Sequence, residues 1–329
     1  MRTLTLPAQE AGTSTDRGFD RYLGPASSRY FGSGYRKVAY GIDRIGIHPG
    51  RSALSAVGSV GYPVDWSVKD GRQSRAHLST IDGVTLALVL SHMLDAEAND
   101  GTRSLARSIE VRAGAKAMTE LHAVPLSLRR AVGDSAVETQ DGPTFTSRIG
   151  TLSVTIGTWA TSGPRVGVQA HGPAPSHLAF TGDHAHATDY VSELVAQPSH
   201  RSSASFDHWA SARADTAGEH PVGEYAARFV DPLVLAGQMA EVLLYSRAGV
   251  DRASTGNLWM RRAAVQLSSR SAESPSFCHA TIRVTKELTI ERNGRRLQCV
   301  DILVDDLFGT RIAASLAYEV ATTQPRVVG

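Results

Sequence analysis

Two long apolar segments, about 150 residues apart, dominate the pattern of hydrophobic and polar positions along the chain. The first runs from His77 through Asp82 into Gly-Val-Thr-Leu-Ala-Leu-Val-Leu and predicts a helix over 77–96. The second runs from Val230 to Tyr245 and predicts a helix over 232–247, with Asp231 as its N-cap and a proline as its first residue. A helix that is apolar on nearly every face must be enclosed by other structure. A polar side chain near its start therefore needs a partner or a task.

Runs that alternate or are rich in β-branched residues flank both helices and predict strands. In the first half the predicted strands cover 38–47, 53–60, 105–111, 122–128 and 146–160. In the second half they cover 165–170, 258–267, 277–291, 295–304 and 312–320, with Asn293-Gly294 as a hairpin turn. A long polar region that contains Asp183-His-Ala-His186, Phe206-Asp-His-Trp209 and His220 precedes the second helix, and its part around Asp183-His-Ala-His186 is expected to be loop-like. The shared order predicts internal duplication of one α+β unit.

One unit that fits is a strongly curved antiparallel sheet wrapped around a single central helix, because such a helix would be apolar all round. Two such units side by side would form a continuous sheet and bring the start of each helix toward their junction. We divide the chain into an N-terminal arm (1–36), a first half (37–160) and a second half (161–329). Residues 1 to about 20 are polar, which predicts a partly disordered segment.

The rest of the arm mixes aromatic residues with glycines from Tyr22 to Lys37. This composition is typical of an irregular segment pinned to a surface by its rings. Binding of a ligand phosphate by the glycine amides is the alternative interpretation, and Tyr35 is our candidate ligand contact in this segment.

Composition and charge indicate a globular protein without a strong electrostatic field. The 329 residues are 42% hydrophobic, and 34 basic against 32 acidic residues give a net charge of +2, which argues against a nucleic-acid partner. No stretch reaches the ~20 apolar residues of a bilayer crossing, and the N-terminus lacks the apolar core of a secretory signal. We therefore expect a cytoplasmic protein. Cys278 and Cys299 are predicted to be buried, reduced thiols, since their spacing suggests neither a disulfide framework nor a zinc site.

The two helix motifs resemble those of hot-dog-fold enzymes. In the dehydratase domains of polyketide synthases an aspartate on the central helix of one half faces a histidine from the other, and Asp82 and His220 supply these residue types. In acyl-carrier dehydratases a His-x-Pro-Gly loop precedes Pro-Gly-x-x-x-x-Glu. Here Gln238 stands six residues beyond Pro232, where the carboxylate would be. This resemblance implies a double hot-dog fold, in which two curved antiparallel sheets each wrap a long apolar helix.

A second resemblance spans most of the chain. The segments that carry it resemble the avirulence D (AvrD) family: Tyr22 to Arg36, His77 to Asp82, Val230 to Tyr245 and Leu258-Trp-Met-Arg-Arg262. Members of that family are implicated in making syringolides, acylated elicitors built from a β-ketoacyl chain and a pentulose. The resemblance implies a biosynthetic enzyme that condenses a β-ketoacyl thioester, on CoA or a carrier protein, with a sugar-like or polyol hydroxyl. The analogous A-factor synthases, also thought to be hot-dog duplications, acylate a triose phosphate hydroxyl.

Acyl transfer to a hydroxyl requires a base near the alcohol, donors for the oxyanion and a dry groove for the acyl chain. We predict Asp82 and His220 as the acid/base pair, because the anion of Asp82 is favoured near a helix N-terminus and can orient a facing imidazole. The helix amides would polarise the thioester carbonyl. A capping-box acid serving Ser79 is the alternative interpretation of Asp82, and a loop histidine bonded to backbone is the alternative for His220.

The second helix offers a degenerate counterpart, formed by His77 with Gln238. An amide cannot exchange protons at neutral pH, so this site is expected to bind rather than to catalyse. Glu241, one turn later, is either the missing carboxylate or a surface acid.

Three residues beyond the second helix are candidates for substrate binding: Arg252, Trp259 and Arg261. Guanidinium groups suit a phosphopantetheine arm or a sugar phosphate, and an ordinary ion pair at the surface or sheet edge is the alternative. We expect no metal and no redox cofactor, because the two histidines of Asp183-His-Ala-His186 lack the further ligands of the usual metal motifs. A hot-dog dehydratase or thioesterase acting on acyl-CoA or acyl-carrier substrates, and a non-catalytic lipid-signal binder, remain alternative functions. The sequence leaves a homodimer open.

Overall fold

A computed structural model describes most of the chain. The described residues are 18–69, 71–97, 102–131, 142–162, 177–181, 188–196, 202–212, 221–250, 252, 258–269, 275–292 and 295–319. Five expectations fall outside them in whole or in large part: the disordered segment up to about residue 20, the strand at 165–170, the histidines at 184 and 186, the catalytic role of His220, and the turn at 293–294.

One thirteen-stranded sheet runs through the described residues, and its neighbouring strands pair antiparallel, in the order β10-β11-β13-β14-β15-β12-β5-β8-β7-β6-β2-β1-β9. The strands up to residue 181 are β1 (Ala39–Ile47), β2 (Ala53–Gly61), β5 (Thr102–Arg112), β6 (Val124–Ala131), β7 (Thr144–Ile149), β8 (Leu152–Ser162) and β9 (His177–Thr181). The later strands are β10 (Thr188–Ala196), β11 (Ser203–Ala212), β12 (Trp259–Leu267), β13 (Phe277–Arg292), β14 (Arg295–Leu307) and β15 (Thr310–Glu319). Two short strands, β3 (Val68–Lys69) and β4 (Arg72–Gln73), form a separate hairpin.

The sheet is continuous across the middle of the chain because β5 pairs with β12, with buried Ile109 opposite buried Val265. Inward side chains along the strands are apolar and alternate with polar outward ones, as a half-buried sheet requires. The predicted α+β class with an antiparallel sheet is confirmed. Strand β9, which we had placed in the second half, pairs with β1 of the first.

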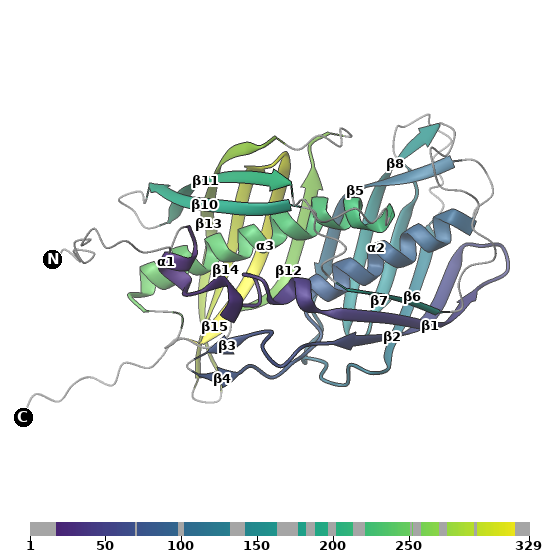
Figure 1. Cartoon of the computed structure of the whole chain (residues 1–329), viewed down its shortest axis with the longest axis horizontal. Helices are drawn as coiled ribbons and strands as arrows, with labels where there is room; N and C mark the ends of the chain where they lie inside the picture. The colour runs from purple at the N-terminus through teal and green to yellow at the C-terminus, as the bar shows by residue number, and fades with distance from the viewer. Residues whose placement is uncertain are drawn as a thin grey trace, which may run out of the picture.

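Two long helices pack on this sheet and on each other (Figure 1). Helix α2 (Thr80–Glu97) contacts β2, β5, β6, β7 and β8, whereas α3 (Pro221–Ala248) contacts β11, β13, β14 and β15. In α2 every side chain from Thr80 to Leu90 is buried, and in α3 the same holds from Phe229 to Ala240. Each helix is therefore enclosed around its circumference over this length.

The start of α3 was predicted wrongly. The helix begins at Pro221 and carries Pro232 in its interior, so Asp231 lies about three turns inside the helix and is not its N-cap. A proline inside a helix removes one backbone hydrogen bond and usually ends or kinks it. That rule favoured a start at Pro232, and burial of the surrounding residues against the sheet outweighs it here.

Two strand predictions also need correction. The run 146–160 is not one strand but the hairpin β7-β8, which turns at Gly150 with φ +55°. The polar region before α3, in which we predicted no strand after residue 170, contains β9, β10 and β11. In β11 the inward positions hold Ala204, Phe206 and His208, and the polar histidine among them hid the alternation.

The described part of the arm, from Gly18 to Lys37, forms the short helix α1 (Asp20–Leu23) and two 3-10 turns, η1 (Ala26–Ser28) and η2 (Gly34–Lys37). It lies across α3 in Figure 1. The contact is close, since a Cβ atom on Gly237 of α3 would lie 2.8 Å from the ring of Phe31. A Cβ on Gly34 would lie 2.0 Å from the carbonyl oxygen of Trp66. The absence of a side chain at both positions lets the arm pack closely against α3 and against the segment around Trp66. Among the described residues, no helix combines the length and the hydropathy needed to span a bilayer.

Candidate active site

The first turn of α2 holds a carboxylate that is entirely enclosed. Asp82 has no exposed surface. Its backbone N–H donates to Ser79 Oγ at 3.1 Å, and Ser79 N–H donates back to Asp82 Oδ2 at 2.7 Å. This reciprocal pair is a capping box, which satisfies donors that a helix start would otherwise leave unpaired. The structure thus shows the capping role that was the alternative interpretation of Asp82. That role uses only one of the two carboxylate oxygens, Oδ2.

Two tyrosines, one on β1 and one directly after β2, complete the environment of Asp82. Tyr40 of β1 donates its hydroxyl to Oδ1 at 2.8 Å, and Tyr62, which follows β2, donates to Oδ2. Burial raises the pKa of the Asp82 carboxyl, while the donors of Tyr62, Ser79 and Tyr40 oppose that rise. Burial, followed by the nearby Asp82 charge, raises the pKa of both tyrosines well above its usual value. The hydroxyls therefore stay protonated at neutral pH and act as donors to the Asp82 carboxyl group.

An aromatic cluster covers the start of α2. The Tyr30 hydroxyl lies 2.7 Å from Ser79 Oγ, and the Trp66 ring lies 5.2 Å from the ring of Tyr30 and 4.7 Å from that of Tyr62, centroid to centroid. Met260 of β12 reaches the same place, with its sulfur 3.5 Å from Thr80 Oγ1. The helix start therefore meets residues from the arm, from the first half and from the second half.

His77 lies at the edge of this cluster, not beside Asp82. Its ring is 6.3 Å from Trp66, centroid to centroid, and its Nδ1 is 3.1 Å from the carbonyl oxygen of Arg75. The Tyr62 hydroxyl that contacts Asp82 also lies 3.1 Å from the carbonyl oxygen of His77. His77 is half-buried. His220, the predicted partner of Asp82, lies outside the described residues, and the predicted pair is untested.

A second polar group lies on α3 beneath the arm. Arg29 is 2% exposed; it donates from Nη1 to Gln238 Oε1 at 2.6 Å and from Nη2 to Asp20 Oδ1 at 2.5 Å. Burial raises the pKa of Glu241, and the positive charges of Arg252, Arg29 and Lys69 lower it. The structure thus places Gln238 and Glu241 near a buried guanidinium, whereas His77, the predicted partner of Gln238, is in the aromatic cluster.

The arm also binds the middle of α3. Tyr35 is buried and donates its hydroxyl to Asp231 Oδ1 at 3.2 Å, while Arg36 Nε donates to the Tyr35 hydroxyl at 3.0 Å. Asp231 and Asp82 are therefore alike: each is a buried helical aspartate that accepts a tyrosine hydroxyl and precedes an apolar run.

The predicted substrate-binding residues beyond α3 are dispersed. Arg252 donates from Nη1 to the carbonyl of Val68 at 3.3 Å, which places it beside the β3-β4 hairpin. Trp259 is 53% exposed and Arg261 is also exposed, on the first residues of β12. The neighbouring Arg262 forms an ion pair with Glu110 of β5 at 3.0 Å, a pair at the surface of the kind that we weighed as the alternative for this run. In the described part of the chain, no group of three or more potential ligands could hold a metal ion.

Four functional candidates were missed from the sequence: Arg29, Tyr30, Tyr40 and Tyr62. Arg29 and Tyr30 belong to the aromatic arm, whose composition was a usable signal. Tyr40 and Tyr62 are single tyrosines in or beside strands, and only the three-dimensional structure shows that they meet Asp82.

Comparison with known families identifies the chain. The family model described as Pseudomonas avirulence D protein (AvrD) matches residues 15–321. The chain belongs to the AvrD family. The match includes the arm, both helices and the strands around them, and it confirms the resemblance stated from the sequence. No curated protein matches this AvrD-family chain.

Several solved structures share features with this AvrD-family chain at low identity. An acyl-CoA thioesterase II, TesB2, from Mycobacterium marinum is 11% identical with a TM-score of 0.43, covering 85% of this chain and 97% of its own. A protein with a hot-dog fold from Alicyclobacillus acidocaldarius is 11% identical with a TM-score of 0.40, covering 84% and 96%. The dehydratase domain of PpsC from Mycobacterium tuberculosis is 11% identical with a TM-score of 0.35, covering 84% and 97%. Scores at this level decide neither the detailed fold nor the activity.

Proposed function

We propose that this AvrD-family protein is a double hot-dog acyltransferase that condenses a β-ketoacyl thioester with a hydroxyl of a sugar-like acceptor. The observation that carries the proposal is the enclosed Asp82 carboxylate at the start of α2, held by Tyr40, Tyr62 and Ser79. Burying an ion is costly unless it is hydrogen-bonded. Stability alone would be served as well by an apolar residue, so a function at this position is the stronger explanation.

The geometry divides the chemistry among several groups. With three donors on its oxygens, Asp82 is suited to be a fixed anion that orients and stabilises an imidazolium, and proton transfer is assigned to His220. His220 takes the proton of the acceptor hydroxyl, the oxygen attacks the thioester carbonyl carbon, and the carbon–sulfur bond breaks. The imidazolium returns its proton to the departing thiolate. Free amides of the first turn of a helix such as α2 carry a partial positive charge that stabilises the oxyanion.

Ring closure uses the same base a second time. The carbon between the two carbonyls of the β-ketoacyl ester loses a proton to His220 and adds to the ketone carbon of the acceptor. The new alkoxide then receives that proton. The balance of this aldol step requires neither a redox cofactor nor a metal.

Binding is assigned to the polar group on α3. An arginine side chain can only donate hydrogen bonds, so its contact with Gln238 fixes Oε1 of the amide toward Arg29. The Nε2 amino group of Gln238 then points away from Arg29, where it can donate to a substrate oxygen. Arg252, Arg261, Trp259 and Tyr35 remain proposed contacts for the thioester carrier or the acceptor. The apolar residues that line both helices supply the dry surroundings that the acyl chain needs.

The test is thiol release with and without an acceptor. Purified protein is incubated with a β-ketoacyl thioester and a panel of ketoses, and free thiol and acylated product are measured. We expect thiol release that depends on the acceptor. Thiol release without an acceptor would identify a thioesterase, and loss of water from a β-hydroxyacyl substrate would identify a dehydratase. The absence of any reaction would identify a lipid-signal binder. Each of these results would overturn the proposal.

Variants locate the reaction. Asp82→Asn and His220→Gln should abolish turnover, whereas the matched control Asp305→Asn, at an exposed aspartate paired with Arg283, should not change it. Because an amide at position 82 has a single acceptor oxygen for the three donors that Asp82 binds, Tyr62→Phe is a second variant, which leaves the carboxylate and its capping box in place. Undiminished turnover in correctly folded Asp82→Asn or His220→Gln protein would remove this site from the reaction.

A further inference from the structure

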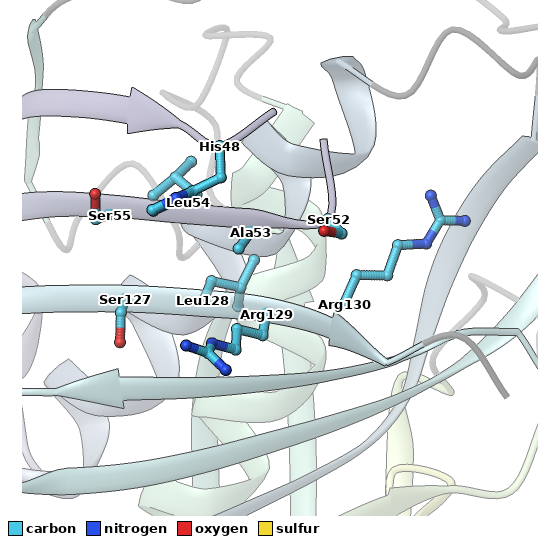
Figure 2. Close-up of a pocket in the computed structure, with 9 residues that line it drawn as sticks. All are labelled: His48, Ser52, Ala53, Leu54, Ser55, Ser127, Leu128, Arg129 and Arg130. Atoms are coloured by element: carbon cyan, nitrogen blue, oxygen red, sulfur yellow. The ribbon is translucent and has the colours of Figure 1, made fainter. Parts of the chain in front are cut away.

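The outer face of the sheet carries a pocket at the opposite end of α2 from Asp82. The pocket has a volume of about 310 Å³ and lies between the β1-β2 turn, β2 and β6 (Figure 2). Its polar lining comes from His48, Ser52, Ser55, Ser127, Arg129 and Arg130. Arg51, in the same turn, donates to the carbonyl of Glu97, the last residue of α2. The length of α2 separates this end from Asp82 by about 22 Å.

Strand register places the polar lining on the side away from the core. Leu54 pairs with Leu128 and both are buried inward, so the flanking pairs, Ser55 with Ser127 and Ala53 with Arg129, face outward. Three small side chains at neighbouring positions leave the hollow, and Figure 2 shows β2 running between His48 on one side and Arg129 on the other. The pocket is therefore a consequence of side-chain size at paired positions.

The backbone around the pocket is held by hydrogen bonds. His48 N–H donates to the carbonyl of Ala53 at 2.9 Å, which closes the turn, and Arg130 N–H donates to the carbonyl of Ser52 at 2.8 Å, which ties the turn to β6. These bonds fix His48 relative to Arg129 without using either side chain. A site of this kind is organised before a ligand arrives, which lowers the entropic cost of binding.

The chemistry of the lining selects an anion. It contains two arginines, a histidine and three serines, and no carboxylate. Among the described residues neither Arg129 nor His48 takes part in an ion pair. Arg148 of β7, directly across from Ser127, is exposed beside the pocket and adds a further positive charge. Guanidinium and hydroxyl donors together match the oxygens of a phosphate group.

We propose that this pocket is a binding site for a small phosphate monoester, separate from the Asp82 site. The volume is at the lower end of the range for ligand pockets, roughly 300–1,000 Å³, so the ligand is the size of a triose or pentose phosphate and not a nucleotide cofactor. Arg129 binds the phosphate oxygens, His48 closes the opposite side, and Ser55 and Ser127 donate from the floor.

Isothermal titration calorimetry on the full chain tests the site with three probes: glycerol 3-phosphate, inorganic phosphate and tricarballylate. We expect saturable binding of glycerol 3-phosphate, weaker binding of inorganic phosphate and none of the tricarboxylate. Arg129→Gln should weaken binding of the monoester roughly tenfold to a hundredfold, because it removes charged hydrogen bonds, and Arg129→Lys should restore part of it.

Arg296→Gln is the matched control, since Arg296 is an exposed arginine on β14 in the other half of the sheet. It should bind glycerol 3-phosphate as the unchanged protein does. Equal binding by Arg129→Gln and Arg296→Gln, binding of the tricarboxylate alone, or no saturable binding by the unchanged protein would each overturn the proposal. The result is independent of turnover at Asp82, so this site and the proposed acyl transfer can fail separately.

Discussion

The hydrogen bond from Tyr40 to Asp82 should couple the two residues strongly. Replacing Tyr40 by phenylalanine removes a 2.8 Å bond to a carboxylate without exposed surface. Hydrogen bonds to buried charged groups contribute about 1.5–3 kcal/mol. We therefore expect Tyr40→Phe to lower the free energy of unfolding by that amount.

The same substitution should have little effect once the carboxylate is absent. In an Asp82→Ala background the Tyr40 hydroxyl has lost its acceptor, and an unpaired buried hydroxyl costs roughly 1–3 kcal/mol. Removing it there by Tyr40→Phe should be neutral or stabilising. The coupling between the two substitutions in a double-mutant cycle should then be at least about 1.5 kcal/mol.

Urea unfolding at pH 7, followed by tryptophan fluorescence, measures the four free energies of the cycle. Tyr318→Phe serves as the matched control, because Tyr318 is also a buried tyrosine but lies on β15, away from Asp82. It should show a coupling with Asp82→Ala of less than about 0.5 kcal/mol, as expected for distant sites. A Tyr40 coupling no larger than that of the control would refute the description of Asp82 as a hydrogen-bonded buried anion.

Three further predictions concern the arm and the second half. Arg29→Met should lower the free energy of unfolding by about 3 kcal/mol, because it leaves the buried partners of the guanidinium unpaired. Limited proteolysis of this variant should then cut the arm before the rest of the chain. An unchanged cleavage pattern would contradict the docking of the arm through Arg29. Gly237→Ala should lower the free energy of unfolding by about 1–3 kcal/mol, because the added methyl group clashes with the Phe31 ring. Adding Phe31→Leu to this variant should recover part of the lost stability in a thermal melt. The absence of any such recovery would argue against this contact. Burial lowers the pKa of His208 from 6.5 to about 4, so the unfolded chain binds the proton at a higher pH than the folded chain does. The free energy of unfolding should therefore fall as the pH drops from about 6.5 to about 4, and His208→Gln should flatten that part of the pH–stability profile. A profile of the variant identical to that of the unchanged protein would show that His208 is not buried as a neutral ring.

The sequence predicted the elements whose burial is visible in the local pattern. The apolar runs after Asp82 and Asp231 are helices, and most strand bounds lie within a few residues of those expected. The start of α3 was missed because Pro232 is a strong local signal, whereas the packing that overrides it comes from distant strands. Strand β11 was missed because His208 occupies an inward position, where its Nδ1 pairs with Ser192 Oγ at 2.7 Å.

The candidate site was predictable in part. Asp82 was identified from its position before an apolar run, and its capping role from the spacing to Ser79. Its tyrosine partners are 42 and 20 residues away in sequence, and single tyrosines near strand ends carry no local sign of such a contact. The Arg29–Gln238 bond spans 209 residues. Contacts between residues so far apart in sequence depend on how the arm folds back over α3. The pattern of hydrophobic and polar positions along the chain does not indicate that path.

The mass of the product tests the central claim most directly. The protein is incubated with a β-ketoacyl thioester whose acyl carbons carry ¹³C, together with an unlabelled ketose, and the mixture is analysed by mass spectrometry. Acyl transfer predicts a product that contains the whole labelled acyl chain joined to the ketose, accompanied by an equivalent of free thiol and absent with Asp82→Asn. A labelled free acid as the sole product, with no label on the ketose, would contradict acyl transfer and show that water is the acceptor.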